Sequence, residues 1–476
     1  MRRSGFALLL ATAALLAAPA AAFAHGIQGR ADLPVPLIAF YWAAAAVLII
    51  SFVALGLAWR RPLLARLEQS SPAADPLPAA VAATTASHGV GRWLAGLAGC
   101  LIWIATIITS MFGSAELNDN PAPIIIFVVW WIMIAVIGGL IGDVWRAMHP
   151  IAFIARSAGF EEQRDEHPWP SSLGIWIGVA GLGAFIWLEL VYPTAADVRL
   201  LGTLVLAWSV GTLAGMQRYG VRVWLDQAEP FAVYTRVLAH MAPRSGGRWR
   251  LPIIGLTSLR PAPGLVALVG LLIGSVSYDG LSRTLWWQRR VAEASVRLVE
   301  QDISARTAQL AFGTFGLVMM VLLAITAFLA AAQLSRLVGR LPRRTAWGTT
   351  AEAFAPSLVP IALAYVIAHY FSYVWFQSQR LIALASDPFG TGANLFGTAE
   401  FVIDYTTLSN EVMWGVQVGS IVIGHVLGLV LAHDRALEIA AADPSSRAVR
   451  SQWPMLALMV VYTVGGLYFL SEGLNA

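Results

Sequence analysis

The chain has little cysteine, no lysine and few charged residues. Cys100 is its only cysteine among 476 residues, which excludes an intrachain disulfide and any metal cluster held by several cysteines. All 31 basic residues are arginine, and charged residues make up 12% of the chain, about half of what a soluble domain carries. The sequence also lacks a Walker motif, a GxSxG elbow and an HExxH motif, so it shows none of the hydrolase signatures that these define.

Apolar residues are what the chain has in excess. Hydrophobic residues make up 58% of it, and its mean hydropathy is +0.68, values typical of an integral membrane protein. Cys100 lies inside one apolar run and is expected to serve packing. The apolar runs predict an all-α polytopic membrane protein with about ten transmembrane helices: 34–59, 93–113, 122–145, 171–193, 197–217, 262–279, 310–334, 355–378, 412–432 and 452–471.

The first 24 residues follow the pattern of a cleaved signal peptide. Arg2 and Arg3 precede an apolar stretch, and Ala22–Ala24 provide an A-x-A cleavage site. Cleavage there would make His25 the first residue of the mature chain. The amine nitrogen and ring Nδ1 of such a histidine can chelate one metal ion, and copper suits these ligands. The alternative is that His25 merely follows the cleavage site.

Arginines predict the orientation. With the mature N-terminus outside, every predicted inner loop carries arginine, as the positive-inside rule requires. One predicted outer loop, 280–309, departs from the rule: it holds five arginines, but it also holds three acidic residues and is therefore mixed in sign. The protein is therefore expected in the bacterial inner membrane, multi-pass, with its mature N-terminus periplasmic or extracellular. Residues 25–476 would form a single transmembrane helical domain, with 71–92 a flexible inner linker and 280–309 an outer amphipathic segment. Because the arginines lie in loops, no nucleic acid is expected as a partner; the lipid bilayer is.

Two segments resemble each other. DVWRAMHPIAFIARSAG (143–159) and RVWLDQAEPFAVYTRVL (222–238) lie about 80 residues apart, each after a predicted two-helix hairpin. Each is predicted to be a short amphipathic helix at the inner surface, with proline at a helix start. Repeats of this kind occur in transporters.

Two histidines fall inside predicted spans, where an ionisable group is costly and hence a functional candidate. His369 lies well inside 355–378, and His425 lies in 412–432. They are candidate ligands of a metal or haem, or members of a proton relay; hydrogen bonds within the bundle are the alternative. At about 1.5 Å per residue, His369 would lie roughly 21 Å and His425 roughly 10 Å above the inner face, which argues against a shared ligand plane. Helix 412–432 also carries glycines at 415, 419, 424 and 428, which include the pair Gly415 and Gly419 at GxxxG spacing, and small residues like these allow close helix approach.

Several acidic residues are predicted to converge at the outer face. Asp279 ends one span close to Arg283, Glu189 ends another, and Glu116 lies in an outer turn. We predict Asp279, Glu116 and Arg283 as catalytic residues, and His25, His369 and His425 as ligands of a divalent metal, zinc or copper. For Asp279, a helix stop paired with Arg283 is the structural alternative.

Three stretches together carry a family resemblance: HGIQGRADLP after the signal peptide, SVSYDGLSRT at the end of a span, and IGHVLGLVLAHDRAL near the C-terminus. They resemble the bacterial membrane-bound fenitrothion hydrolase family over nearly the whole mature chain. The resemblance implies a membrane-bound hydrolase that cleaves organophosphorothioate triesters to a nitrophenol and a dialkyl thiophosphate, but it implies no catalytic set. The positions that match are His25, Asp279, Arg283, His425, His433 and Asp434.

Three functions stay open at this point. The first is hydrolysis of a lipophilic organophosphorus triester by metal-activated water, which for a xenobiotic substrate would be a side activity. The second is a copper-dependent redox or copper-handling protein that uses His25. The third is a transporter, which would move a solute and form no product. The oligomeric state does not follow from the sequence.

Overall fold

A computed structural model describes residues 37–69, 89–245, 248–440 and 446–475 of the chain. The predicted signal peptide, His25 and residues 71–88 of the predicted linker lie outside these ranges. The first half contains α2 (Leu37–Ala58), α3 (Leu64–Gln69), α5 (Val90–Phe112), η1 (Leu117–Asp119), α6 (Ala122–Ile124), η2 (Ile125–Met133), α7 (Ile134–Leu140), α8 (Val144–Met148), α9 (Pro150–Ser157), α10 (Trp176–Val191), α11 (Val198–Tyr219), α12 (Val221–Gln227) and α13 (Pro230–Ala239).

The second half begins with a short hairpin and continues with the longest helices. It contains β1 (Arg244–Ser245), β2 (Arg248–Trp249), η3 (Ile254–Ser258), α14 (Leu265–Ser282), α15 (Leu285–Val299), α16 (Ala305–Gly339), β3 (Arg344–Thr345), β4 (Gly348–Thr349), α17 (Thr350–Phe354), η4 (Ala355–Leu358), α18 (Val359–Gln377), α19 (Arg380–Ser386), η5 (Tyr405–Thr407), α20 (Asn410–Ile439), α21 (Ser446–Ser451) and α22 (Trp453–Asn475). Strands β1 and β2 pair antiparallel, as do β3 and β4.

The expected all-α polytopic fold is confirmed. Nine helices among the described residues are long and apolar enough to cross a membrane, and a tenth apolar helix, α10, has 16 residues. Each of the ten predicted spans overlaps one of these helices, although the ends of several differ from the predicted bounds. A helix suits this setting because it satisfies its own backbone hydrogen bonds where no water can.

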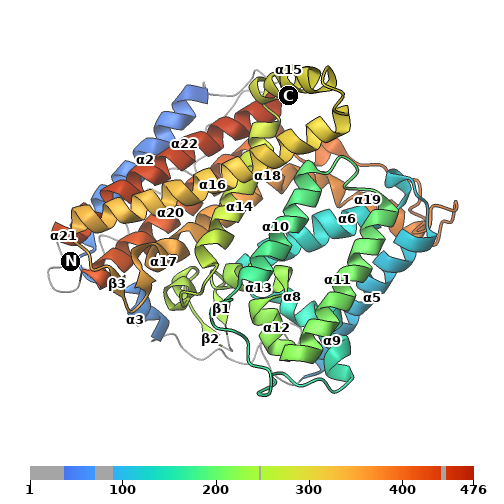
Figure 1. Ribbon diagram of the computed structural model, residues 1–476, viewed down its shortest axis with the longest axis horizontal. Helices are drawn as coiled ribbons and strands as arrows, with labels where there is room; N and C mark the ends of the chain where they lie inside the picture. Colours follow the sequence, from blue (N-terminus) through green and yellow to red (C-terminus); the bar gives the residue numbers. More distant parts are fainter. Residues whose placement is uncertain (1–36, 70–88, 246–247, 441–445, 476) are drawn as a thin grey trace.

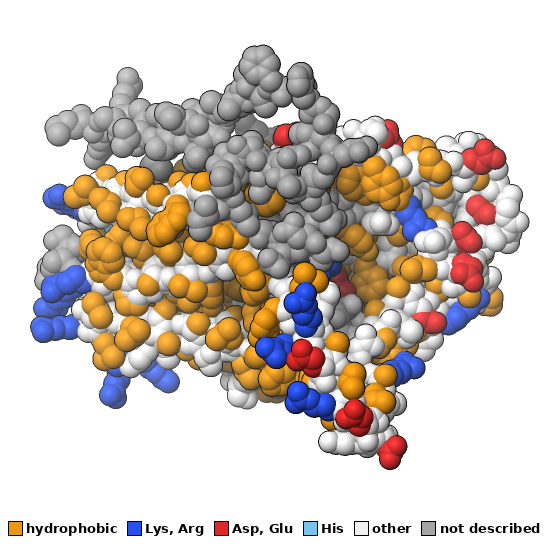
Figure 2. All heavy atoms as spheres, turned by 90° about the horizontal axis from the view of Figure 1, so that it is seen from above, with side chains coloured by type: hydrophobic (Ala, Val, Ile, Leu, Met, Phe, Trp, Pro, Cys, Tyr) orange, Lys and Arg blue, Asp and Glu red, His pale blue; other side chains and the backbone are white. Residues whose placement is uncertain are grey.

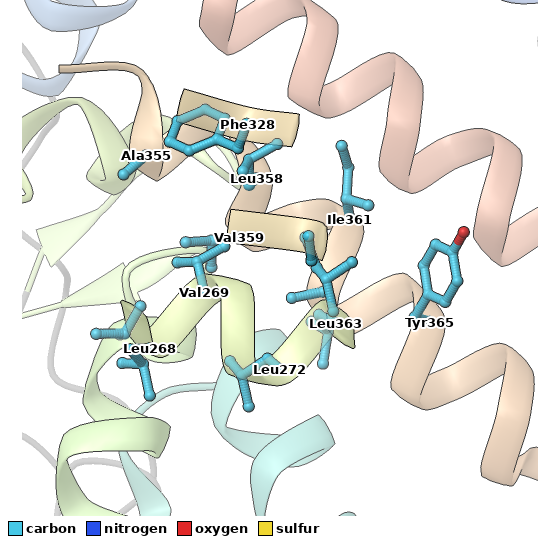
Figure 3. Close-up of a cluster of buried hydrophobic side chains, with 14 of the residues drawn as sticks. Leu268, Val269, Leu272, Phe328, Ala355, Leu358, Val359, Ile361, Leu363 and Tyr365 are labelled. Carbon is cyan, nitrogen blue, oxygen red and sulfur yellow. The ribbon is translucent and has the colours of Figure 1, made fainter. Parts of the chain in front are cut away.

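The helices form two packed groups. In Figure 1, the long helices α2, α16, α20 and α22 lie together, α5, α10 and α11 lie on the other side, and α14 and α18 run between them. Figure 3 shows the apolar contact in the middle, where Leu268, Val269 and Leu272 of α14 lie beside Val359 and Leu363 at the start of α18. This core fixes the relative position of α14 and α18, which carry the main candidate residues.

The charged side chains are not evenly distributed over the molecule. Figure 2 shows only basic side chains along the left edge of this face, acidic and basic side chains mixed in the lower centre and toward the right edge, and an apolar surface over the left half between them. We call the end that carries α15 the α15 end and the opposite end, which carries the β3–β4 hairpin, the α17 end. Arginines 336, 340, 343 and 344 lie at the α17 end, and Glu116, Asp387 and Asp404 lie in exposed loops away from it.

The predicted outer segment 280–309 and the predicted inner linker 71–92 both contain helical residues. Within 280–309, α14 continues to Ser282, α15 follows, and α16 starts at Ala305. None of the residues of α15 is buried, and Trp286 is 59% exposed, as expected of an amphipathic surface helix. The predicted linker 71–92 is too long, because α5 already begins at Val90.

The two similar segments differ from their prediction as single surface helices. Each folds as two short helices, α8 and α9 or α12 and α13, and the second helix begins at Pro150 or Pro230. Proline breaks the helix there because it lacks an N–H and clashes with the preceding turn. Helix α13 packs against α7 and α10 and buries most of its residues. It therefore belongs to the core of the bundle.

Candidate functional site

The candidate site is centred on Asp279, which contacts His369 from a neighbouring helix. His369 Nε2 lies 2.5 Å from Asp279 Oδ2. Helix α14 brings Asp279 near its last turn, and α18 brings His369, so the contact joins two spans 90 residues apart in the chain. The two side chains are 8% and 13% exposed, which makes this a largely buried carboxylate–imidazole pair.

Arg283 and Tyr370 complete the hydrogen bonding of the Asp279 carboxylate. Arg283 Nε donates to Oδ1 at 3.2 Å and Nη2 donates to Oδ2 at 3.3 Å, while the Tyr370 hydroxyl donates to Oδ2 at 3.4 Å. The Arg283 side chain is 53% exposed. The His369 side of the site is therefore largely buried, whereas the Arg283 side is open to the surface of the protein.

Glu189 lies on the buried side of this pair. It lies near Asp279 and the Tyr370 hydroxyl, and the Trp131 indole is within hydrogen-bonding reach of its carboxyl group. The Tyr234 hydroxyl in the same core region is buried without a hydrogen-bond partner among the described residues, which costs about 1–3 kcal/mol.

The other predicted site residues lie apart from Asp279. Glu116 is exposed before η1, where its backbone N–H donates to Ser114 Oγ. His425 is fully buried in α20, its Nδ1 lies 2.8 Å from the Ile421 carbonyl oxygen, and its ring lies beside Tyr365. His369 and His425 thus have different partners, and the structure does not join them in one site. His25 lies outside the described residues.

His433 and Asp434, which carry part of the family resemblance, have structural partners. His433 lies 2.8 Å from both Gln452 Oε1 and the Trp59 carbonyl oxygen. Asp434 Oδ1 accepts from the Trp59 indole and from the Leu63 N–H. Both residues tie α20 to the chain that follows α2, at the α17 end.

The described residues offer no donor set for the predicted divalent metal. Among them, no three His, Cys, Asp or Glu side chains are grouped so that they could hold an ion. At the candidate site, both oxygens of Asp279 accept hydrogen bonds, and the adjacent Arg283 guanidinium opposes a second cation. A metal held partly by His25 stays a prediction.

A second buried acid–base pair joins the two similar segments. His149 and Glu229 each precede the proline that starts α9 or α13, and their Nε2 and Oε2 atoms are 3.5 Å apart with neither side chain exposed. Glu229 also accepts from the indoles of Trp145 and Trp208 and from the backbone N–H of Ala232. Burial acts to raise the pKa of Glu229, but these bonds and His149 outweigh it and lower the pKa. Glu229 is therefore a carboxylate that these donors hold in place, and its role is structural.

Sequence reasoning found part of this arrangement. It placed Asp279, Arg283 and Glu189 at one face, and it identified His369 without its partner. It missed Trp131, Tyr234 and Tyr370, because an aromatic residue in an apolar span gives no signal of its own. It also missed the His149–Glu229 pair, although the aligned His-Pro and Glu-Pro dipeptides of the two similar segments could have indicated it.

Comparison with models of known families, with curated proteins and with solved structures finds no match to this chain. The resemblance to fenitrothion hydrolase therefore stays a prediction. The function has to be argued from the chemistry of the candidate site.

Proposed function

We propose that the protein is a membrane-bound hydrolase of lipophilic organophosphorus triesters. The observation that carries the proposal is the contact between His369 and Asp279, because a carboxylate-bound imidazole is a common general base. In this proposal the α15 end faces the periplasm, as the arginines at the α17 end favour, and the substrate reaches the site from the bilayer.

The reaction follows from the contacts of the pair. Asp279 occupies Nε2 of His369, so the other ring nitrogen, Nδ1, takes a proton from water and Asp279 stabilises the resulting imidazolium. The hydroxide forms a bond to phosphorus, and the bond from phosphorus to the aryl oxygen breaks. The products are a dialkyl thiophosphate and an aryloxide, which needs little protonation when it carries a nitro group. The half-exposed Arg283 would stabilise negative charge that develops on the phosphoryl group.

The proposal is tested by release of nitrophenol from fenitrothion by the purified protein in lipid nanodiscs. Wild type should release it, and H369Q and D279N should each lower kcat/KM by at least 10²-fold, since general-base catalysis is worth about 10²–10⁴-fold. His240, at the C-terminal end of α13, provides the matched control: H240Q should keep the activity. No release by wild type, or equal release by H369Q and H240Q, would refute the proposal.

The predicted metal-activated route makes a different set of predictions. Metal analysis should then find a bound divalent ion, and treatment with a chelator should abolish activity. Loss of His25 should remove both metal and activity, provided that N-terminal sequencing shows intact cleavage. If activity survives the chelator, the Asp279–His369 pair is sufficient. Bound copper without nitrophenol release would favour the copper-handling alternative.

A transporter is the second candidate, and the helix breaks at Pro150 and Pro230 favour it. Broken helices that meet in the core recur at transport sites, where their N-termini point at anionic groups. Here the N-terminus of α13 donates two backbone N–H groups to its own N-cap, the Glu229 carboxylate, and His149 at the start of α9 faces the same carboxylate. This function predicts uptake of a radiolabelled solute into proteoliposomes with no product formed. Here E229Q, and not H369Q, would abolish the measured activity.

A further inference from the structure

Arg244 is a buried arginine without a counter-ion. It lies in strand β1 and is 7% exposed. Its Nε and Nη1 atoms are fully buried and have no hydrogen-bond partner among the described residues, and none of the ion pairs among these residues includes it. Its guanidinium carbon lies 5.8 Å from the ring of Trp249, its partner on strand β2. A guanidinium stays charged, and burying a charge without an opposite charge is costly.

The guanidinium opens to the surroundings through its third nitrogen. Within the part of the chain that the structure describes, Nη2 of Arg244 is neither fully buried nor hydrogen-bonded. Because the charge is delocalised over the three nitrogens, an anion at Nη2 compensates the whole group. The neighbouring surface is apolar, since Trp249 is 43% and Leu251 60% exposed. Tryptophan is enriched where a membrane meets water, so this surface is of the kind that meets lipid headgroups.

The chain around Arg244 holds more arginines than acids. Residues 218–260 contain seven arginines and two acidic residues, on the side that the positive-inside rule assigns to the cytoplasm. Both acids have other partners: Asp226 pairs with Arg146, and Glu229 accepts from indole and backbone N–H groups. No carboxylate of this segment is therefore left for Arg244. Basic pockets on the cytoplasmic side of membrane proteins bind the headgroups of anionic lipids.

We propose that Arg244 binds the phosphate of an anionic phospholipid in the inner leaflet. Nη2 donates a charge-assisted hydrogen bond to a phosphate oxygen, and the exposed Trp249 and Leu251 side chains contact the apolar part of the lipid. Free phosphate shares the chemistry of the headgroup, but it gains nothing from this apolar surface. The site belongs to the β1–β2 hairpin and not to the Asp279–His369 pair, so the inference stands whether or not the protein is a hydrolase.

Native mass spectrometry of the delipidated full-length protein tests the site, with dioleoyl phosphatidylglycerol as the probe. Wild type should bind the first lipid at least about tenfold more tightly than R244Q, as the loss of one charge-assisted hydrogen bond implies. Arg260 is exposed in the same segment and gives the matched control, so R260Q should bind as wild type does. Equal binding by wild type and R244Q, or equal losses in R244Q and R260Q, overturns the proposal. Displacement of the lipid by millimolar inorganic phosphate overturns the assignment to a lipid and favours a free anion.

Thermal unfolding in detergent separates a lipid site from a purely structural arginine. Without lipid, R244Q loses no hydrogen-bonded partner, so its melting temperature should not fall below that of wild type. Added phosphatidylglycerol should raise the melting temperature of wild type but not of R244Q, because a ligand that binds only the folded state stabilises it. A lower melting temperature of R244Q without lipid, or an equal gain of both proteins with lipid, contradicts the proposal. Neither measurement uses turnover, so a failed hydrolase assay leaves both results interpretable.

Discussion

At the residue scale, the partner of each buried histidine decides its role. His369 contacts a carboxylate and can act as a base, whereas His149 holds one ring nitrogen on the Ala152 N–H and faces Glu229 with the other. His433 contacts a carbonyl and an amide oxygen. His425 and His240 each have Nδ1 at a carbonyl oxygen of the preceding turn. Of these, only His369 combines partial exposure with a carboxylate, which is why the proposal rests on it.

The buried His240 side chain is expected to lower the free energy of unfolding in mild acid. Burial, followed by the charges of Arg236 and Arg250, lowers its pKa from 6.5 to about 4, against the raising effect of its bond to the Arg236 carbonyl. Between these two values the unfolded chain binds a proton that folded His240 does not, so stability falls as pH drops through this window. The full loss is on the order of 3 kcal/mol.

Thermal unfolding between pH 7 and pH 4.5 measures this effect. H240Q should show a smaller fall in melting temperature over the window than wild type. Parallel pH curves for the two proteins would show that His240 does not contribute.

The Glu229 carboxylate predicts a large effect on stability. Its two oxygens accept from Trp145, Trp208, Phe231 and Ala232, so the amide nitrogen of E229Q would face at least two donors. Breaking a buried ionic network of this kind costs about 3–5 kcal/mol. The melting temperature of E229Q should fall accordingly.

The control for E229Q is an ion pair at the surface. Glu162 pairs with Arg156 at 2.6 Å but is 49% exposed. An exposed pair is worth about 0–1 kcal/mol, so E162Q should melt close to wild type. Similar losses in E229Q and E162Q would contradict the buried network.

At the element scale, the four glycines of α20 that were expected to allow close packing divide into two pairs. No close approach occurs at Gly415 and Gly419, since a Cβ built at either position meets nothing within 4 Å. The next pair along α20 makes the contact instead: a Cβ at Gly424 would lie 2.8 Å from the Pro360 carbonyl oxygen, and one at Gly428 would lie 2.6 Å from that of Ser357. Helix α20 therefore packs on α18 and η4 through its second half.

This difference between the two glycine pairs gives two matched pairs of substitutions. G424A and G428A push α20 away from α18 and should each destabilise the protein by about 1–3 kcal/mol, as overpacking does. G415A and G419A add a methyl group in open space and favour the helix, so they should be neutral or stabilising. Melting temperatures of the four variants decide between the pairs, and equal losses in both would contradict the packing described.

At the scale of the whole molecule, the arginines at the α17 end predict the orientation in the membrane, because the arginines at the α15 end are mixed with acidic residues. The single cysteine, Cys100, is buried, with its Sγ 3.4 Å from the Pro150 carbonyl oxygen. It should therefore react little with a labelling reagent, and labelling should report on an introduced cysteine. In intact cells with a permeable outer membrane, an impermeant maleimide should label R290C on α15 but not R343C at the α17 end. Both should react after lysis, and the reverse pattern would invert the topology and move the candidate site to the cytoplasmic side.

Part of the candidate site could be read from the sequence because position along a span is a local property. Asp279 at the end of an apolar run and His369 inside another follow from hydropathy alone. Which of these residues meet depends on how two spans 90 residues apart are packed, and on the rotation of each helix about its axis. That is why His425 and Glu116, equally prominent in sequence, have no part in the pair, whereas Trp131 and Tyr234 border it.

The sequence by itself determined the helical class of the protein and the approximate position of each apolar helix. One of the ten predicted spans, α10, is shorter than the other nine, and the ends of several helices differ from their predicted bounds. Burial of about 20 apolar residues in lipid is decided within each segment, so these predictions needed no knowledge of the neighbours. Tertiary structure alone decided the partners: His369 with Asp279, His149 with Glu229, and Gly424 and Gly428 against α18. Between helices in lipid, apolar surface does not select a partner, because the lipid is as apolar as the helix. Shape and hydrogen bonds select it, and these exist only once the bundle has assembled.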